Sequence, residues 1–338
     1  MLAYIIRRVV VGAVMLVVMS LVTFLLFFAS PIDPARYACG KNCSQELKAA
    51  VTKQLGYDEP VTTQWSGFMA GLVVGRDFPL DKKLRESHPE QIVHCPAPCL
   101  GYSSYSKKTV NDMVTRALPV TISLSIYAFL LWITAGVLIG IVAALRKGSL
   151  VDRLIVGASL VAYAFPVFFV GSFLLRFVAI KWGLWEVPSY SPFFANPGSF
   201  LYNMFFPALT LALLFMAGYV RVTRSFVIES MSEDYIRTAR AKGLKGRIIV
   251  RKHALRAALT PLVTMAGIDF AGLLAGAIIT ETVFNINGLG RMAVYANQNY
   301  DLPVLVALVL ASGFFLITAN IIVDILYAYI DPRVRMGK

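Results

Sequence analysis

Long runs of apolar residues alternate along the chain with shorter charged connections. Each of six runs is long enough to cross the roughly 30 Å hydrocarbon layer of a bilayer as a helix, which takes about 20 residues. Because a backbone in lipid must satisfy its own hydrogen bonds, long runs without period-2 alternation are helices. We therefore predict an all-α fold, a polytopic membrane protein. The spans are expected near residues 9–30, 117–145, 153–180, 207–228, 260–284 and 303–330.

Composition agrees with a membrane protein and excludes an ordinary soluble domain. Hydrophobic residues make up 57% of the chain and charged residues 15%, and the mean hydropathy is +0.67. The first apolar run follows Arg7 and Arg8 and exceeds the roughly 7 to 15 residues of a secretory signal. We interpret it as a retained first helix, residues 1–30.

Lysine and arginine beside the spans predict the orientation, because short basic loops stay in the cytoplasm. With an even number of spans, four basic segments lie on the same side, at residues 7–8, 146–153, 234–261 and 331–338. Both termini are therefore expected to be cytoplasmic. The formal net charge of +13 then reflects topology and attraction to lipid headgroups, and it requires no nucleic-acid partner.

A hydrophilic insert, residues 31–108, separates the first span from the remaining chain, 109–338, and is expected outside the cytoplasm. It contains all four cysteines, which we expect to form disulfides in an oxidising compartment. Their spacing leaves the three possible pairings open. A metal or haem site that includes His94 is the alternative, but the spacing is neither CxxC nor CxxCH, so we expect no metal. The cysteines are Cys39, Cys43, Cys95 and Cys99.

The sequence contains no GxxxxGK[ST] phosphate loop, no HExxH and no GxSxG. The segment "GLGRMA", residues 288–293, fits a relaxed dinucleotide fingerprint, but it lies between membrane spans instead of between a strand and a helix. We therefore expect a non-enzymatic chain without a cofactor. A secondary ion-coupled carrier is one alternative, although it would need a buried charge relay and repeated halves. A membrane enzyme or assembly factor is another, and it would need convergent catalytic residues.

Small residues in the fifth run predict close helix packing. Gly272 and Gly276 form a GxxxG pair, and Glu281 follows them near the outer end of the run. The pair packs either within the subunit or as a gate against a second membrane subunit. Glu281 either faces a cavity or makes a capping or interhelical hydrogen bond. In the third run, Pro166 predicts a kink.

The basic stretch 234–261 predicts two helices joined by glycine. Ser230 and Glu233 have the spacing of a capping box at the start of the first helix, and Gly243 is expected to end it. A second basic amphipathic helix follows, and Pro261 is expected to open the next span. The element is either a hairpin on the membrane surface or a partner site.

The stretch resembles the EAA loop of permeases from ATP-binding-cassette (ABC) importers, in its peptide-permease variant: "DYIRTARAKGL…HALRAALTP". Further blocks resemble, in the right order, the DppB/OppB class of dipeptide and oligopeptide permeases, so the resemblance covers the whole chain. These blocks are "MLAYIIRRVVVGAVMLVVMSLVTFLLFFASPIDPA", "QLGYDEPVTTQW", "TETVFNINGLGR" and "DILYAYIDPRVR".

The resemblance implies one permease subunit of a type I importer in a bacterial cytoplasmic membrane. It implies four kinds of partner: a second homologous permease, two ATP-binding subunits or one fused subunit that hold ATP and Mg, an extracytoplasmic solute-binding protein, and lipid. Peptide is the expected substrate, with nickel, glutathione or haem as alternatives. Residues 229–259 would be the coupling loop. Its contacts to the ATPase would be Arg237, Thr238, Ala239, Arg240, Ala241, Lys242 and Gly243.

Overall fold

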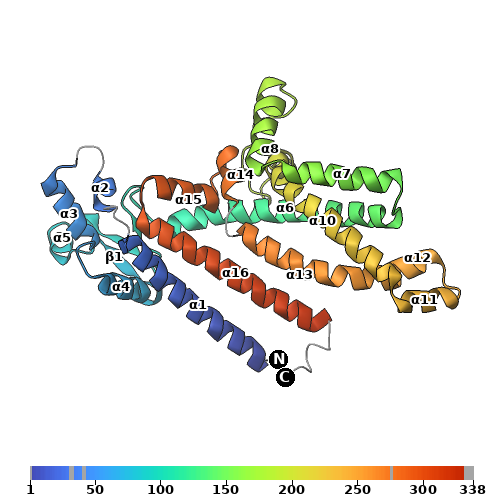
Figure 1. Cartoon of the computed structure of the whole chain (residues 1–338). Helices are drawn as coiled ribbons and strands as arrows, with labels where there is room; N and C mark the ends of the chain where they lie inside the picture. Colours follow the sequence, from blue (N-terminus) through green and yellow to red (C-terminus); the bar gives the residue numbers. More distant parts are fainter. Residues whose placement is uncertain (1, 30–33, 40–42, 275–276, 331–338) are drawn as a thin grey trace. The chain divides into compact units, whose positions relative to one another are not determined.

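The computed structural model describes residues 2–29, 34–39, 43–274 and 277–330. The chain divides into two compact units, one of residues 1–119 and 287–317 and the other of residues 120–286 and 318–338 (Figure 1). Two long helices contribute residues to both units. They are α6 (Val110–Leu145) and α16 (Leu302–Ile330).

The first unit combines long apolar helices with the small elements of the insert. Two antiparallel strand pairs, β1 with β2 and β3 with β4, stiffen the insert. Besides parts of α6 and α16, the elements are α1 (Leu2–Ala29), α2 (Pro34–Cys39), α3 (Gln45–Leu55), α4 (Val61–Val74), β1 (Arg76–Phe78), α5 (Lys82–Ser87), the 3₁₀ turn η1 (Pro89–Gln91), β2 (Val93–Cys95), β3 (Tyr102–Ser103), β4 (Lys108–Thr109) and α15 (Leu289–Gln298).

Glycines let α1 and α16 approach each other closely. A Cβ added at Gly12 would lie 2.6 Å from Ile317 Cγ2, and one at Gly313 would overlap Met19. A second buried cluster joins the start of α6 to α15 and α16, and it includes Val110, Leu289 and Ala307. Leu100 of the insert packs against this cluster, so the insert has an apolar contact with the helices of its own unit.

The second unit is almost wholly helical. It contains most of α6, the second part of α16 and the following elements: α7 (Leu150–Ala164), α8 (Val167–Phe173), the π-helical η2 (Leu174–Lys181), α9 (Pro197–Asn203), α10 (Phe205–Ser232), α11 (Asp234–Ala241), α12 (Gly246–Ile248), the π-helical η3 (Ile249–Ala254), α13 (Leu255–Leu274) and α14 (Ile278–Val283).

The core of this unit surrounds Trp132, which is fully buried and stacks on Phe215 with ring centroids 4.6 Å apart. Two glycines of α6 allow α10 to approach. A Cβ at Gly140 would lie 2.7 Å from the Val220 carbonyl oxygen, and one at Gly136 would lie 2.9 Å from Tyr219 Cβ. The α6–α10 contact therefore follows the small-residue rule of membrane helices.

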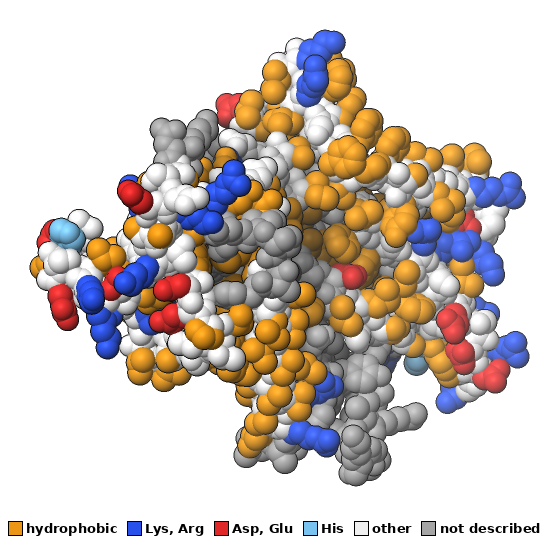
Figure 2. All heavy atoms as spheres, turned by 60° about the vertical axis from the view of Figure 1, so that its left-hand side comes forward, with side chains coloured by type: hydrophobic (Ala, Val, Ile, Leu, Met, Phe, Trp, Pro, Cys, Tyr) orange, Lys and Arg blue, Asp and Glu red, His pale blue; other side chains and the backbone are white. Residues whose placement is uncertain are grey.

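Among the described residues, four helices are long and apolar enough to cross a membrane, and the number rises to six if each of two bent pairs counts as one span. The four are Ile6–Phe27, Val110–Leu145, Phe205–Ser232 and Leu302–Ile322. They confirm an all-α membrane fold. Figure 2 shows hydrophobic side chains over much of the visible face, with Lys and Arg side chains gathered in small groups toward its edges.

The remaining two predicted spans differ from expectation. The third is broken before Pro166, where α7 and the following helix bend by 93°. The kink at Pro166 is therefore confirmed, and it is a full break. The fifth prediction, 260–284, begins too late, because the helix that contains this run starts in the basic stretch at Gly246 and bends by 44° between Leu259 and Pro261.

Candidate coupling site

The C-terminal end of α11 is closed by Gly243, as the sequence predicts. Its backbone has φ = +73°, a left-handed conformation that glycine adopts without steric cost. The Gly243 amide donates to the Arg240 carbonyl at 2.9 Å, and the Leu244 amide donates to Ala239 at 3.3 Å. These two bonds form a Schellman motif, so the chain reverses sharply after α11.

The predicted capping box is wrong. Ser230 lies inside α10, which continues to Ser232, and the N-cap of α11 is Glu233, without a side-chain hydrogen bond. The Ser230 hydroxyl instead lies 2.7 Å from Tyr235 Oη and donates to the Ala254 carbonyl at 3.0 Å. Ser230 thus joins α10 to the segment that follows the glycine turn, a contact that local spacing cannot indicate.

The second basic helix is continuous with the following span. It begins at α12, passes through the π-helical η3 and enters α13. Pro261 lies inside α13, so the prediction that it opens the span is wrong. A proline in a helix removes one backbone hydrogen bond, which is consistent with the 44° bend between Leu259 and Pro261.

The two arms of this element pack on each other through a small apolar core. Its buried side chains are Ile236 and Ala239 from α11 with Ile249 and Ala254 from η3, and Met231 packs against them. Ala239 is therefore part of the internal core. The other predicted coupling residues are exposed: Arg237, Thr238, Arg240, Ala241, Lys242 and Gly243. We call the element from Asp234 to Ala254 the coupling knob.

Electrostatic contacts within the coupling knob are weak. Arg237 lies 3.5 Å from Asp234 in an i,i+3 pair, and both side chains are more than three-quarters exposed. Such pairs contribute little because water screens them. A basic hollow of about 390 Å³ lies beside the coupling knob and is lined by Tyr235, Lys252, His253, Arg256 and Ala257. The exposed charges thus remain accessible to a partner.

The predicted gate residues lie in different environments. A Cβ at Gly272 would meet no atom within 4 Å, so this face of α13 is open within the chain. Gly276 lies outside the described residues. Glu281, on α14, is fully buried and accepts a hydrogen bond of 2.7 Å from Thr121. The structure thus places Glu281 in an interhelical hydrogen bond within its own unit.

We predict that removing this hydrogen bond lowers the thermal stability of the protein. Glu281→Ala leaves a cavity and removes the acceptor of buried Thr121, a loss of about 1–3 kcal/mol, whereas Glu281→Gln keeps an acceptor oxygen. Thermal unfolding of the purified protein would show a lower Tm for the alanine variant than for the glutamine variant. An unchanged Tm in the alanine variant would contradict this structural role and instead favour the gate expected from the sequence.

An ion pair that sequence reasoning missed connects α7 to α10. Arg224 donates two hydrogen bonds to Asp152, at 2.6 Å from Nε and 2.8 Å from Nη2. Asp152 also accepts the Gly148 amide at 2.9 Å and is almost fully buried. The charge pattern around residues 146–153 predicts membrane topology but not this pair. An aspartate in an otherwise basic turn, with an arginine inside an apolar run, was the available signal.

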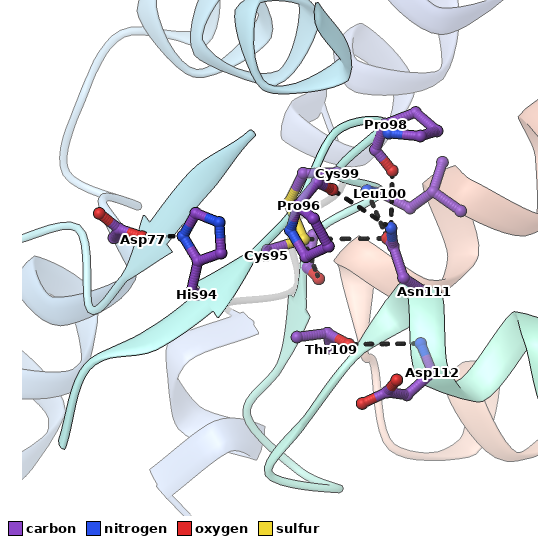
Figure 3. The surroundings of a disulfide bond; sticks show 11 residues. Asp77, His94, Cys95, Pro96, Pro98, Cys99, Leu100, Thr109, Asn111 and Asp112 are labelled. Atoms are coloured by element: carbon purple, nitrogen blue, oxygen red, sulfur yellow. Dashed lines mark hydrogen bonds and ion pairs between the residues drawn. A yellow bond between two sulfur atoms is a disulfide. The ribbon is translucent and has the colours of Figure 1, made fainter. Parts of the chain in front are cut away.

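Each cysteine bonds to the nearer cysteine of the sequence. Cys39 is joined to Cys43 and Cys95 to Cys99, with sulfur–sulfur distances of 2.26 and 2.09 Å. In Figure 3 the His94 ring lies beside Asp77, 2.7 Å from its carboxylate, on the opposite face of β2 from Cys95. Cys95 and Cys99 are fully buried, and Asn111 holds their loop through the Leu100 amide and the Pro98 carbonyl.

We predict that the buried disulfide, Cys95–Cys99, stabilises the insert more than the half-buried one, Cys39–Cys43. Both bridges close loops of equal length, which constrains the unfolded chain by about 2 kcal/mol in each case. The double variant Cys95→Ala/Cys99→Ala also loses buried contacts, while Cys39→Ala/Cys43→Ala changes half-buried positions. Limited proteolysis of the insert should therefore be faster in the first variant. Equal rates would contradict a role for burial.

The described helices define a polytopic membrane protein, and family comparison identifies its class. The family model for the inner membrane component of binding-protein-dependent transport systems matches residues 136–336. A second family model, for the N-terminal part of the membrane component of these systems, matches residues 1–125. The chain belongs to this family of inner membrane transport components.

Curated relatives match from end to end. The chain is 33% identical to the probable peptide ABC transporter permease protein y4tP of Sinorhizobium fredii, over 98% of this chain and 99% of the relative. It is 32% identical to the dipeptide transport system permease protein DppB of Escherichia coli K12, over all of both chains. Among solved structures, the inward-facing MetNI methionine ABC transporter matches with a TM-score of 0.50 and 17% identity, over 65% of this chain and 97% of that one. This last likeness concerns the fold.

Proposed function

We propose that the chain is one permease subunit of an ATP-driven importer of dipeptides or oligopeptides. The observation that carries the proposal is the exposed, basic coupling knob in a chain that resembles peptide permeases over its whole length. The buried cluster around Ile236 and Ala239 packs the two arms of the coupling knob against each other. The coupling knob can therefore transmit a displacement of a bound partner to α10 and α13, the two helices that flank it.

The proposed orientation places both termini and the coupling knob in the cytoplasm, with the insert outside. The partners are a second homologous permease, two ATP-binding subunits or one fused subunit, and an extracytoplasmic solute-binding protein. ATP and Mg bind to the partner subunits, and this chain holds no cofactor. Closure of the ATPases moves the coupling knobs and opens the membrane path toward the docked binding protein. Hydrolysis returns the transporter to its other state, so nucleotide acts through its different contacts with two conformations.

The decisive experiment is ATP hydrolysis by the tagged protein, gently purified from its native membrane, with and without peptide-loaded binding protein. Co-purifying ATPase subunits and hydrolysis stimulated by the loaded binding protein would support the proposal. A preparation that assembles with nothing and hydrolyses nothing, yet moves solute along an ion gradient, would indicate a secondary carrier. Competition among peptide, nickel, glutathione and haem for the binding protein then identifies the substrate.

A further inference from the structure

A cavity of about 360 Å³ lies within the unit of residues 1–119 and 287–317. Its volume is in the range of small-molecule sites in proteins. The walls come from the last turns of α1, from α4, from the insert and from the first turns of α16, and they are mainly apolar. The lining includes Phe24, Phe27, Gly67, Phe68, Arg76 and Phe78.

The depth of this cavity relative to the membrane follows from the packing of α4 on α1. Trp65 Nε1 donates to Ser20 Oγ at 3.0 Å, and the rings of Phe24 and Phe68 are 5.3 Å apart. Ser20 precedes the end of the apolar span at Phe27 by two turns, about 10 Å of helix. The α4 sequence "VTTQWSGFMAGLVV" contains no charged residue. Helix α4 therefore lies at the level where headgroups meet acyl chains.

The charged side chain of Arg76 lies at the wall of this mainly apolar cavity. Arg76, on β1, pairs with Cys95 in the strand ladder, and its guanidinium lies 5.7 Å from the Phe68 ring centre and 5.4 Å from that of Phe78. Gly71 makes this placement possible, because a Cβ there would overlap the arginine side chain. The strand pair, the glycine and the two aromatic rings thus hold the guanidinium at the cavity wall.

The guanidinium has unmet hydrogen-bonding capacity. Arg76 Nε is buried without a hydrogen-bond partner, and no carboxylate pairs with Arg76 in the part of the chain that the structure describes. Burial lowers the pKa of Arg76 to about 10, so the side chain remains positively charged at neutral pH. Glu59 also lines the cavity but is solvent-exposed. A partly buried charge without a counter-ion is costly, and an anionic ligand would offset that cost.

We propose that this cavity binds an anionic phospholipid of the surrounding leaflet, with the lipid phosphate paired to Arg76 and an acyl chain against Phe24, Phe27 and Phe68. Guanidinium and phosphate match as a bidentate pair. An acyl chain fits against the phenylalanine-lined wall, whereas a free anion has no apolar group to place there. The location at the ends of two apolar helices favours lipid over the terminal carboxylate of a peptide, since lipid is present there at high concentration.

The test measures lipid binding to the full transporter purified in detergent, by native mass spectrometry and by the shift of Tm. The probes are dioleoylphosphatidylglycerol, dioleoylphosphatidylcholine, inorganic phosphate and a tripeptide. Arg76→Gln removes the charge. Gly67→Phe fills the cavity and keeps Arg76, and it is accommodated because a Cβ at Gly67 meets no atom within 4 Å. Lys82→Gln, at an exposed position of the insert, is the matched control for charge loss.

We expect phosphatidylglycerol to bind the wild type and the Lys82→Gln variant equally, and about tenfold more weakly to Arg76→Gln and to Gly67→Phe. Phosphatidylcholine and inorganic phosphate should produce no comparable shift. Undiminished phosphatidylglycerol binding in Gly67→Phe would overturn the proposal. This test does not depend on Arg76→Gln, so it remains decisive if that variant fails to fold. An equal response to inorganic phosphate would identify a free-anion site, and displacement of phosphatidylglycerol by the tripeptide would identify a peptide site. Either result would also overturn it.

Discussion

Replacing Gly243 with tryptophan is expected to uncouple ATP hydrolysis from uptake while the subunit still assembles with its partners. Two effects act at this position. The backbone φ of +73° disfavours any residue with a Cβ, and the indole would project from the exposed tip of the coupling knob. No atom lies within 4 Å of an added Cβ, so the indole meets no close neighbour there, and the cost to the fold of the subunit itself is the backbone strain. Uptake and ATPase activity of reconstituted transporter, measured together, test this expectation.

A graded series at Gly243 separates backbone strain from steric obstruction. Gly243→Ala should cost about 1 kcal/mol through strain alone, while Gly243→Asn adopts the left-handed conformation more readily. Gly148→Trp is the control, because this glycine also has a positive φ and open space around it but lies outside the coupling knob. Normal transport by Gly243→Trp would contradict the assignment of this turn as the coupling contact. An equal loss of coupled uptake in the asparagine and alanine variants would show that the contact with the partner matters more than the backbone conformation of the turn.

Neutralising Arg224 or Asp152 is expected to cause the largest loss of thermal stability among single substitutions in the second unit. The pair has two short hydrogen bonds, and Asp152 is 3% exposed. Removing one partner leaves the other charge poorly compensated, so Tm should fall by about 5 °C or more. Thermal unfolding of Asp152→Asn and Arg224→Gln in detergent tests the expectation.

The control for this ion pair is the charge swap Asp152→Arg/Arg224→Asp. Restoration of part of the lost Tm in the double variant would demonstrate direct coupling of the two charges. Arg153→Gln, at the neighbouring exposed position, should leave Tm nearly unchanged. Additive losses in the swapped variant, without any recovery, would mean that the two residues act independently.

Local sequence was sufficient to predict the membrane fold. Apolar runs of about 20 residues have few alternatives to transmembrane helices, because hydrophobic burial and internal hydrogen bonding both require them. Gly243 was predictable for a similar reason, since a glycine after a short helix marks a left-handed cap. The family resemblance was also readable from sequence, because several motifs occurred in the expected order, and the full-length relatives confirm it.

Other features depended on residues that are distant in sequence. The spacing left the cysteine pairing open, and the structure joins near neighbours. Ser230 suggested a local cap but bonds across the turn to Ala254. The partnership of Asp152 with Arg224 spans 72 positions, so no helical or strand periodicity could reveal it.

The sequence alone determined that this protein is a mainly helical membrane component, where most of its apolar segments lie and where the basic coupling knob turns. Only the tertiary structure decided which polar groups meet, that the third span breaks by 93° before Pro166, and that Arg76 lies at an apolar cavity. Hydrophobicity and backbone propensity act within a segment and are therefore readable locally. Hydrogen bonds, ion pairs and cavities form between segments, and their partners are specified only when the chain folds.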